Sequence, residues 1–373
     1  MNRVAWLVVI SFAVTFVLPA EKRTIRIAFA DFCVDPAGTS DIQGQKFVSM
    51  LEKYYHVEIG PNADFLFYSC WGDAFRQYAN CVKIFYTAEN VMPNFNECDY
   101  AITCHPIHFG SRHFQYNSDI LNFKSCERVR LQVDQKCLQR KFCNFIYCNA
   151  SKGNGAILRQ DFAKKLMRYK KVDCPGRVLN NMQQTIVPRG GGNAWESKVA
   201  FIKDYKFTIA FENASSEGYV TEKLVHPFMA NSIPIYWGNP SVGTLLNTKA
   251  FINCHEYDNL DTVMQKVMEL DQDDAKYLAM LREPIVKEET MLNNEKSLEQ
   301  FLVAVIEKGN IPFYKTQLYL PKKNLFTRVS YFNYGRYWIL SKVMCGAKGR
   351  HYRNKFAEIK LQLHCLGNAV KVF

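Results

Sequence analysis

The chain has 373 residues, of which 48% are hydrophobic, 14% aromatic and 22% charged. Such a composition can bury a large core, so it excludes a disordered, collagen-like or coiled-coil protein, and the length suits two domains. Thirteen cysteines are too few for a disulfide scaffold, and no CxxC pair has a matching second pair, which argues against a structural zinc site.

Positive charge is concentrated at one end of the chain. The net charge of +12 lies wholly after residue 307, where 13 Lys and Arg residues accompany a single acid, Glu358. Residues 1–307 hold equal numbers of basic and acidic side chains and are neutral. A neutral body without a recognised binding module argues against nucleic acid as a partner.

The chain begins with an apolar stretch, residues 4–20, preceded by Arg3. This stretch is shorter than the roughly 20 residues that span a bilayer comfortably, and it fits a signal peptide or a short anchor. A buried N-terminal strand or helix is the alternative. Basic residues stand on both sides of the stretch, so charge does not choose its orientation.

A first β/α unit follows. Apolar runs predict strands at residues 24–32, 63–70, 82–87 and 100–104, and apolar spacing predicts a helix around residues 47–54. The polar stretch at residues 109–140 is the best candidate for an irregular region and a domain boundary.

The pattern then restarts. Strands are predicted at residues 142–149, 206–213, 233–238 and 251–254, with helices at residues 158–169 and 220–230 and after residues 260, 273 and 297. Two successive β/α units imply two doubly wound α/β domains with a cleft between them. Ligands in such sheets bind beyond the carboxyl ends of the strands.

The densest polar segment follows a strand of the second unit, at residues 211–224. A helix begins near Tyr219, and the free N–H groups of a helix start form an anion site. Lys223 adds a cation in the first turn, where it is unfavourable for the helix and therefore suggests a facing anion. Taken alone, a strand, loop and helix with one lysine are purely structural about half the time.

Two further candidates come from the same kind of argument. Arg159 lies at the start of the helix that opens the second unit, although such an arginine is usually solvated. Glu89 directly follows a strand of the first unit, where a carboxylate can act as a general base or simply cap a helix.

Read in order, these segments make the chain resemble the α-1,3/1,4-fucosyltransferases that use GDP-fucose, and especially their bacterial-type members. The strongest match is FENASSEGYVTEK (211–223), followed by IPIYWGNP (233–240). YTAENVMPNFNECDYAI (86–102) resembles the acceptor-side motif of the family. FCNFIYCNASKGNGAILRQDF (142–162) and YKKVDCPGRVLNN (169–181) resemble its donor-domain segments.

The resemblance implies a GT-B fold, in which two Rossmann-like doubly wound domains face a central cleft. It implies an inverting transfer of L-fucose to a glycan that contains N-acetylglucosamine, with no cofactor and no essential metal. The general base would be Glu89, and the diphosphate would be held by Arg159 and Lys223. The donor site would also be lined by three residues, Asn213, Tyr219 and Glu222.

The patterns along the chain, together with this resemblance, divide it into four parts. They are a hydrophobic signal or anchor segment (1–23), an acceptor-side domain (24–135), a GDP-fucose-binding domain (136–310) and a basic aromatic tail (311–373). The implied partners are GDP-fucose and an oligosaccharide or glycolipid acceptor. The acceptor itself and the choice between α-1,3 and α-1,4 linkage are not encoded in any pattern that we can read.

Two other interpretations stay open. One is a transferase of the same fold that uses another nucleotide sugar, against which the FENxxxxxYVTEK segment argues. The other is a non-catalytic, membrane-associated glycan-binding protein on a decayed transferase fold. The joint presence of Glu89, Arg159, Glu222 and Lys223 argues against decay.

The tail carries twelve aromatic residues between Phe313 and Phe373 beside its cations. Tyr352, Phe356 and Leu363 share one face of a predicted helix, which could lie on an anionic membrane surface or pack on the body. We expect membrane association, at the cytoplasmic face in a bacterium or as a single-pass protein of the Golgi lumen in a eukaryote. A chain that ends near Gly309 is expected to keep its fold and activity.

Overall fold

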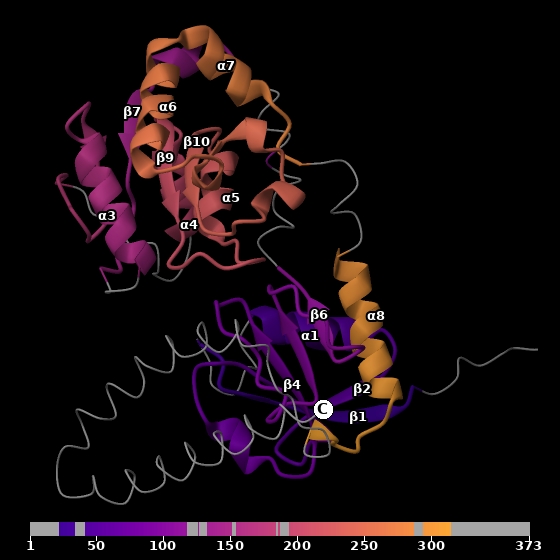
Figure 1. Cartoon of the computed structure of the whole chain (residues 1–373). Coiled ribbons are helices and arrows are strands. Elements are labelled where there is room, and N and C mark those ends of the chain that lie inside the picture. Colours follow the sequence, from indigo (N-terminus) through magenta and orange to yellow (C-terminus); the bar gives the residue numbers. More distant parts are fainter. Residues whose placement is uncertain are drawn as a thin grey trace, which may run out of the picture.

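A computed structural model describes residues 22–33, 42–117, 126, 133–150, 154–183, 186, 194–286 and 294–314. Within these ranges the chain forms two α/β units, which Figure 1 shows one above the other. The apolar leader up to residue 21 and the tail from residue 315 lie outside the described residues. No helix in the described ranges is both long and apolar enough to cross a bilayer.

The first unit is built on a parallel sheet with the strand order β2-β1-β3-β4-β5-β6. Its strands are β1 (Thr24–Ala30), β2 (His56–Ile59), β3 (Phe65–Tyr68), β4 (Val82–Thr87), β5 (Tyr100–Thr103) and β6 (His113–Gln115). Every residue of β3, β4 and β5 is buried. Such continuous apolar runs are typical of a parallel sheet that is covered on both faces.

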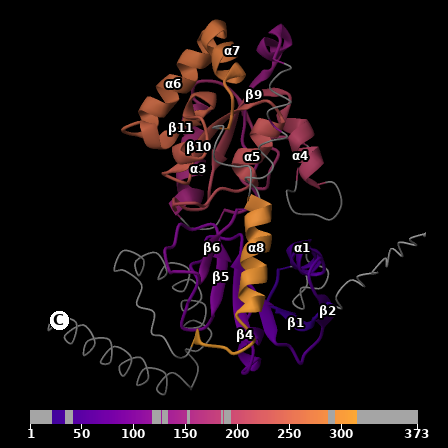
Figure 2. The ribbon, with the colours of Figure 1, turned by 90° about the vertical axis from the view of Figure 1, so that its right-hand side faces the viewer.

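One face of the first sheet is covered by helix α1 (Ile42–Leu51), through Phe47 and Met50, and by helix α8 (Asn294–Glu307). Figure 2 shows α8 lying along this unit. The sequence boundary assigned α8 to the second unit. It belongs to the first, because its buried Leu298 and Leu302 pack in the core of the first sheet.

The residues after α8 also belong to the first unit. The backbone N–H groups of Phe313 and Tyr314 each donate a hydrogen bond to the buried Asp99 carboxylate at 2.6 Å. Arg112 lies with its guanidinium 5.0 Å from the ring centroid of Phe313. The boundary at residue 311 is therefore drawn too early, and the packed chain reaches at least residue 314.

The second unit is built on a parallel sheet with the strand order β11-β10-β9-β7-β8. Its strands are β7 (Lys141–Asn144), β8 (Val172–Asp173), β9 (Tyr205–Phe211), β10 (Ile233–Trp237) and β11 (Ile252–Asn253). Its helices are α3 (Asn154–Leu166), α4 (Ala194–Ile202), α5 (Glu222–Met229), α6 (Leu260–Gln272) and α7 (Asp274–Arg282). Short 3₁₀ turns in the two units are Ala74–Gln77, Gln135–Gln139, Val242–Thr244, Thr248–Ala250 and Cys254–Glu256.

Helices cover both faces of this second sheet. Alternate side chains of β9 separate the two layers: Phe207 and Ile209 pack with α3, α6 and α7, whereas Ala210 packs with α5. The two doubly wound α/β units predicted from the sequence are thus confirmed. The stretch expected to be irregular, residues 109–140, contains β6, whose three residues are too few to give a periodic signal.

Candidate functional site

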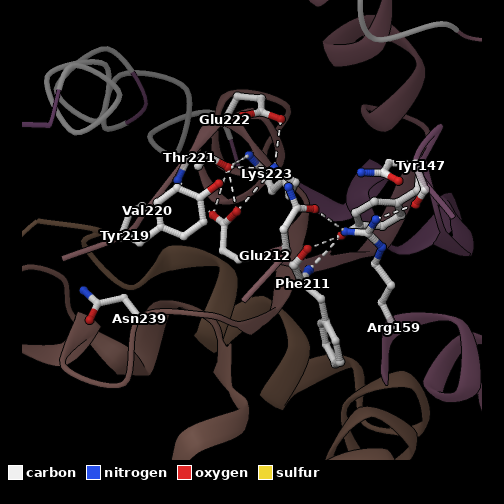
Figure 3. A network of polar contacts seen from close by, with 12 residues as sticks. Tyr147, Arg159, Phe211, Glu212, Tyr219, Val220, Thr221, Glu222, Lys223 and Asn239 are labelled. Atoms are coloured by element: carbon white, nitrogen blue, oxygen red, sulfur yellow. Dashed lines mark hydrogen bonds and ion pairs between the residues drawn. The ribbon is translucent and has the colours of Figure 1, made fainter. Parts of the chain in front are cut away.

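The polar residues predicted for the donor site lie at the carboxyl edge of the second sheet. Strand β9 ends at Phe211, and the side chain of the next residue, Glu212, is completely buried. Its carboxylate accepts hydrogen bonds from the backbone N–H of Thr221 at 2.8 Å and from the Thr221 hydroxyl at 2.8 and 2.9 Å (Figure 3). Thr221 is the N-cap of α5, and its hydroxyl oxygen accepts from the N–H of Lys223 at 3.3 Å. Glu212 therefore fixes the start of α5 against the end of β9.

Lys223 is held between two carboxylates. Its Nζ lies 3.3 Å from Glu212 Oε2 and 3.3 Å from Glu222 Oε1, and its side chain is 14% exposed. Burial works against the ammonium group, but the charges of Glu212 and Glu222 outweigh it and raise the pKa of Lys223. The lysine is therefore a permanent cation at the first turn of α5.

The two carboxylates differ in their surroundings. Burial raises the pKa of Glu212. Burial also opposes the charge of Glu222, but Lys223 and Lys198 outweigh it and lower the pKa of Glu222. The Glu222 side chain is 42% exposed, so it can accept hydrogen bonds from a ligand while it remains ionised.

Arg159 reaches the same edge from α3. Its Nη1 donates to Asn213 Oδ1 at 2.9 Å and its Nη2 donates to the Asn149 carbonyl at 2.6 Å. The guanidinium carbon lies 4.1 Å from the ring centroid of Tyr147, and Figure 3 shows the two side chains together. The residue is 1% exposed, and its Nε has no hydrogen-bond partner among the described residues. Arg159 is thus a buried, oriented cation rather than a solvated one.

A glycine allows α3 to approach this closely. A Cβ atom on Gly155 would lie 2.3 Å from the carbonyl oxygen of Glu212 and 2.6 Å from that of Asn213. Any larger residue would push the first turn of α3 away from the strand end. The close approach brings Arg159 within reach of Asn213.

The loop after Glu212 touches the first unit. Asn117 Nδ2 donates to the carbonyl oxygens of Gly218 and Val220 at 3.3 and 2.8 Å. Gly218 has a φ of +78°, and a Cβ atom there would lie 2.0 Å from the carbonyl oxygen of Cys104, which follows β5. The carboxyl edges of the two sheets therefore meet at this loop.

Glu89 lies on the first-unit side of this junction. It follows β4, is partly exposed, and its backbone N–H donates to Thr87 Oγ1 at 3.0 Å. Burial, together with the charges of Glu212 and Glu89, raises the pKa of the buried Tyr219 phenol. Glu89 of the first unit is thus close enough to Tyr219 of the second for its charge to act on the phenol.

The structure brings five predicted residues together at the second sheet, and they are Arg159, Asn213, Tyr219, Glu222 and Lys223. It places Glu89 across the junction from them. Glu212 and Tyr147 lie within the sequence motifs, but no pattern in the sequence assigns them a role. The available signal was a carboxylate directly after a buried strand, in front of a helix whose first turn carries a lysine.

In the described part of the chain, no group of three or more His, Cys, Asp or Glu residues could hold a metal ion.

Two family models cover most of both units. Residues 27–121 match the alpha-(1,3)-fucosyltransferase FucT N-terminal domain, and residues 139–296 match the C-terminal region of glycosyltransferase family 10 (fucosyltransferase). The first match covers the unit that carries Glu89, and the second covers the unit that carries the two cations.

Curated relatives agree with these matches. The chain is 26% identical to alpha-(1,3)-fucosyltransferase FucT of Helicobacter pylori over 79% of this chain and 66% of that protein. It is 30% identical to GDP-fucose protein O-fucosyltransferase 3 of Bos taurus over 40% of this chain and 30% of that one. It is 28% identical to alpha-(1,3)-fucosyltransferase B of Drosophila melanogaster over 41% and 35%. The chain thus spans less than two thirds of the length of each of these relatives.

Solved structures share the arrangement of both units. An alpha1,3-fucosyltransferase crystallised with GDP is 25% identical and superposes with a TM-score of 0.59, over 82% of this chain and 94% of the other. The structure titled with GDP-fucose gives 25% identity and a TM-score of 0.59, over 78% and 93%. The GT-B type of fold is thereby confirmed, and the chain belongs to the glycosyltransferase family 10 fucosyltransferases.

Proposed function

We propose that the chain transfers L-fucose from GDP-fucose to a hydroxyl group of a glycan that contains N-acetylglucosamine, with inversion at the sugar carbon. One observation carries the proposal. Two cations, the buried Arg159 and the largely buried Lys223, lie at the carboxyl edge of one sheet, and Glu89 lies across the junction at the edge of the other. A donor diphosphate and an acceptor hydroxyl need this division of charge.

The reaction is a single displacement. The acceptor oxygen forms a bond to C1 of fucose while the bond between C1 and the β-phosphate oxygen of GDP breaks. The bonding electrons leave with GDP, and the acceptor proton passes to the Glu89 carboxylate. Attack from the face opposite GDP gives inversion, so one general base is enough.

The donor side must stabilise the negative charge that grows on the departing diphosphate. Arg159 and Lys223 are already oriented for this task by Asn213, Tyr147, Glu212 and Glu222, so little reorganisation is needed. Tyr219, Glu222 and Asn213 would line the ribose, phosphate or fucose. We also propose that no divalent metal is essential, since the two side chains supply positive charge; full activity in a chelator is the expected result.

The proposal of a glycan acceptor rests on the share of this chain that each relative matches. The similarity to the protein O-fucosyltransferase extends over 40% of this chain, whereas that to the Helicobacter pylori enzyme extends over 79%. The alpha-(1,3)-fucosyltransferase N-terminal model covers the unit that carries Glu89, where the acceptor would bind. A glycan is therefore favoured over a polypeptide, with α-1,3 or α-1,4 linkage.

The proposal is tested by a donor and acceptor screen with the purified chain. GDP-fucose, GDP-mannose and UDP-galactose are offered with type 1 and type 2 N-acetyllactosamine and with a peptide mixture, and products are identified by mass. We expect transfer from GDP-fucose to at least one of the two disaccharides, with and without chelator. Transfer from another donor, or to peptide alone, would contradict the proposal.

A further inference from the structure

A third cation lies buried beside the donor site, in addition to Arg159 and Lys223. Lys198, in α4, is 5% exposed. Among the residues that the structure describes, it makes no ion pair and no side-chain hydrogen bond. Buried ammonium groups are ordinarily paired, because the desolvation cost of an isolated ion is large.

The packing of α4 directs this lysine toward the site. Trp195, one turn earlier on the same face of α4, stacks against His226 of α5 with ring centroids 6.4 Å apart and an interplanar angle of 26°. Val199 and Ile202 pack with Ala230, just after α5. Lys198 is therefore on the face of α4 that meets the helix carrying Glu222 and Lys223.

The charges around Lys198 do not neutralise it. Burial lowers its pKa, and the groups that act on it from the neighbouring elements are Glu222, Lys223, Glu212 and Cys148. Both carboxylates already lie 3.3 Å from Lys223 Nζ. Cys148 precedes Asn149, whose carbonyl accepts from Arg159. Lys198 of α4 thus lies near the strand edge that Lys223 reaches from α5 and Arg159 from α3.

We propose that Lys198 is a third cation of the donor site and contacts the diphosphate of the bound nucleotide. This inference rests on the proposed function, because it takes the ligand to be a nucleoside diphosphate. A diphosphate beside Lys198 supplies the anionic partner that the described residues do not provide. Without that ligand, the lysine destabilises the folded protein.

The alternative role for Lys198 is structural. In that case its charge serves only to keep Glu222 ionised, at a distance longer than an ion pair. The two roles predict opposite effects on the unliganded protein. Replacing an uncompensated buried charge by an apolar side chain of similar length stabilises a protein, whereas removing a counter-charge destabilises it.

The test compares Lys198→Met with a matched control, Lys203→Met, which replaces an exposed lysine just after α4. Calorimetry measures the binding of GDP, guanosine and inorganic pyrophosphate to the full chain, and thermal melting measures its stability without ligand. For Lys198→Met we expect about tenfold or greater weakening of GDP and pyrophosphate binding, because charge-assisted hydrogen bonds are lost. Guanosine affinity should be unchanged, and the melting temperature should be equal to or above that of the wild type. The control should match the wild type throughout.

Unchanged pyrophosphate affinity in Lys198→Met would overturn the inference. So would an equal loss of guanosine and GDP binding, or a lower melting temperature of the unliganded variant. A wild-type chain that binds pyrophosphate but not GDP would contradict the proposed function alone, and the pyrophosphate result would still decide the role of Lys198. A wild-type chain that binds neither ligand would contradict both proposals.

Discussion

Lys223 occupies a position that is unfavourable for a cation, because the first turn of a helix carries the positive end of the dipole. The structure shows what compensates it: the buried carboxylate of Glu212, which also accepts two kinds of hydrogen bond from Thr221. Glu212 is thus a positioning residue that keeps the cation and the helix start in place. Its own burial is costly, and the cost is offset only while all its partners remain.

Neutralising Glu212 should therefore destabilise the protein. In Glu212→Gln the amide presents an N–H group to Thr221 or Lys223, which are donors themselves. Removing one partner of a buried charge pair costs about 3 kcal/mol. Urea unfolding should show a loss of this order, whereas Glu217→Gln, on the exposed part of the same loop, should show almost none. Equal stability of the two variants would contradict the role assigned to Glu212.

Two histidines make stability depend on pH. Burial, with a contribution from the charge of Lys198, lowers the pKa of His226 to about 4, and burial lowers that of His113 to about 4. Between about pH 6.5 and pH 4 the unfolded chain therefore binds more protons than the folded one. The contribution of the two neutral histidines to the free energy of unfolding should be complete above about pH 6.5. It should decrease as the pH falls from about 6.5 to about 4.

The measurement is the urea midpoint at several pH values. His226→Phe keeps an aromatic ring against Trp195 and should make the decrease shallower. His56→Phe, which replaces an exposed histidine on β2, serves as the control and should leave the slope unchanged. An unchanged slope in His226→Phe would show that this histidine is protonated in the folded protein.

At the scale of elements, the loop between β9 and α5 has two tasks: it carries donor-site residues and it contacts the first sheet. Gly218 makes the contact possible through its positive φ and its missing Cβ atom. Gly218→Ala would place a Cβ atom 2.0 Å from the Cys104 carbonyl oxygen, so the loop must move away from the first sheet. A left-handed, strained residue costs on the order of 1–3 kcal/mol.

We therefore expect Gly218→Ala to lower the melting temperature and to reduce the transfer rate at least about tenfold, because a shift of about 1 Å at the reacting groups costs more than that. Gly60→Ala is the matched control, since a Cβ atom there meets nothing within 4 Å. Both properties should stay at the wild-type level in the control. Equal behaviour of the two variants would contradict the proposed role of the loop in aligning the two sheets.

Elements were predictable from the sequence to different degrees. Runs such as β4 and β9 are apolar throughout, and a buried parallel strand needs no alternation, so both were found. The edge strands β2 and β8 were missed because one is largely exposed and the other has two residues. The motifs located Arg159 and Lys223 because their types suit a phosphate. Glu212 and Lys198 were not assigned, because only tertiary packing shows that one carboxylate is fully buried and that one ammonium group has no ion pair among the described residues.

At the scale of the whole molecule, the chain crosses between its units twice. It leaves the first unit after β6 and returns through α8, whose apolar face completes the first core. No local pattern distinguishes a helix that packs on the preceding sheet from one that packs on the earlier sheet, which ends at Gln115, so the sequence boundary separated α8 from its partners. The segment after α8 then closes over Asp99.

This return predicts where the chain can be shortened. A chain that ends at Gly309 lacks Phe313 and Tyr314 and leaves the buried Asp99 carboxylate with only the Lys83 N–H among its described donors. Hydrogen bonds to a charged group contribute roughly 1.5–3 kcal/mol each. Thermal melting should therefore show the chain ending at Gly309 to be clearly less stable than a chain ending at Tyr314. Equal melting temperatures would mean that residues 310–314 do not stabilise the first unit. That result would agree with the boundary that the sequence predicts at residue 311.

The central claim is that the junction between the two sheets is a transferase site with Glu89 as its base. The most direct measurement is the rate of fucose transfer from GDP-fucose to N-acetyllactosamine by Glu89→Gln, with GDP affinity measured on the same sample and Glu58→Gln, an exposed carboxylate of β2, as the control. The account predicts unchanged GDP affinity and at least about a 10²-fold loss of transfer in Glu89→Gln, with wild-type behaviour in the control. Near-normal transfer by Glu89→Gln would contradict it.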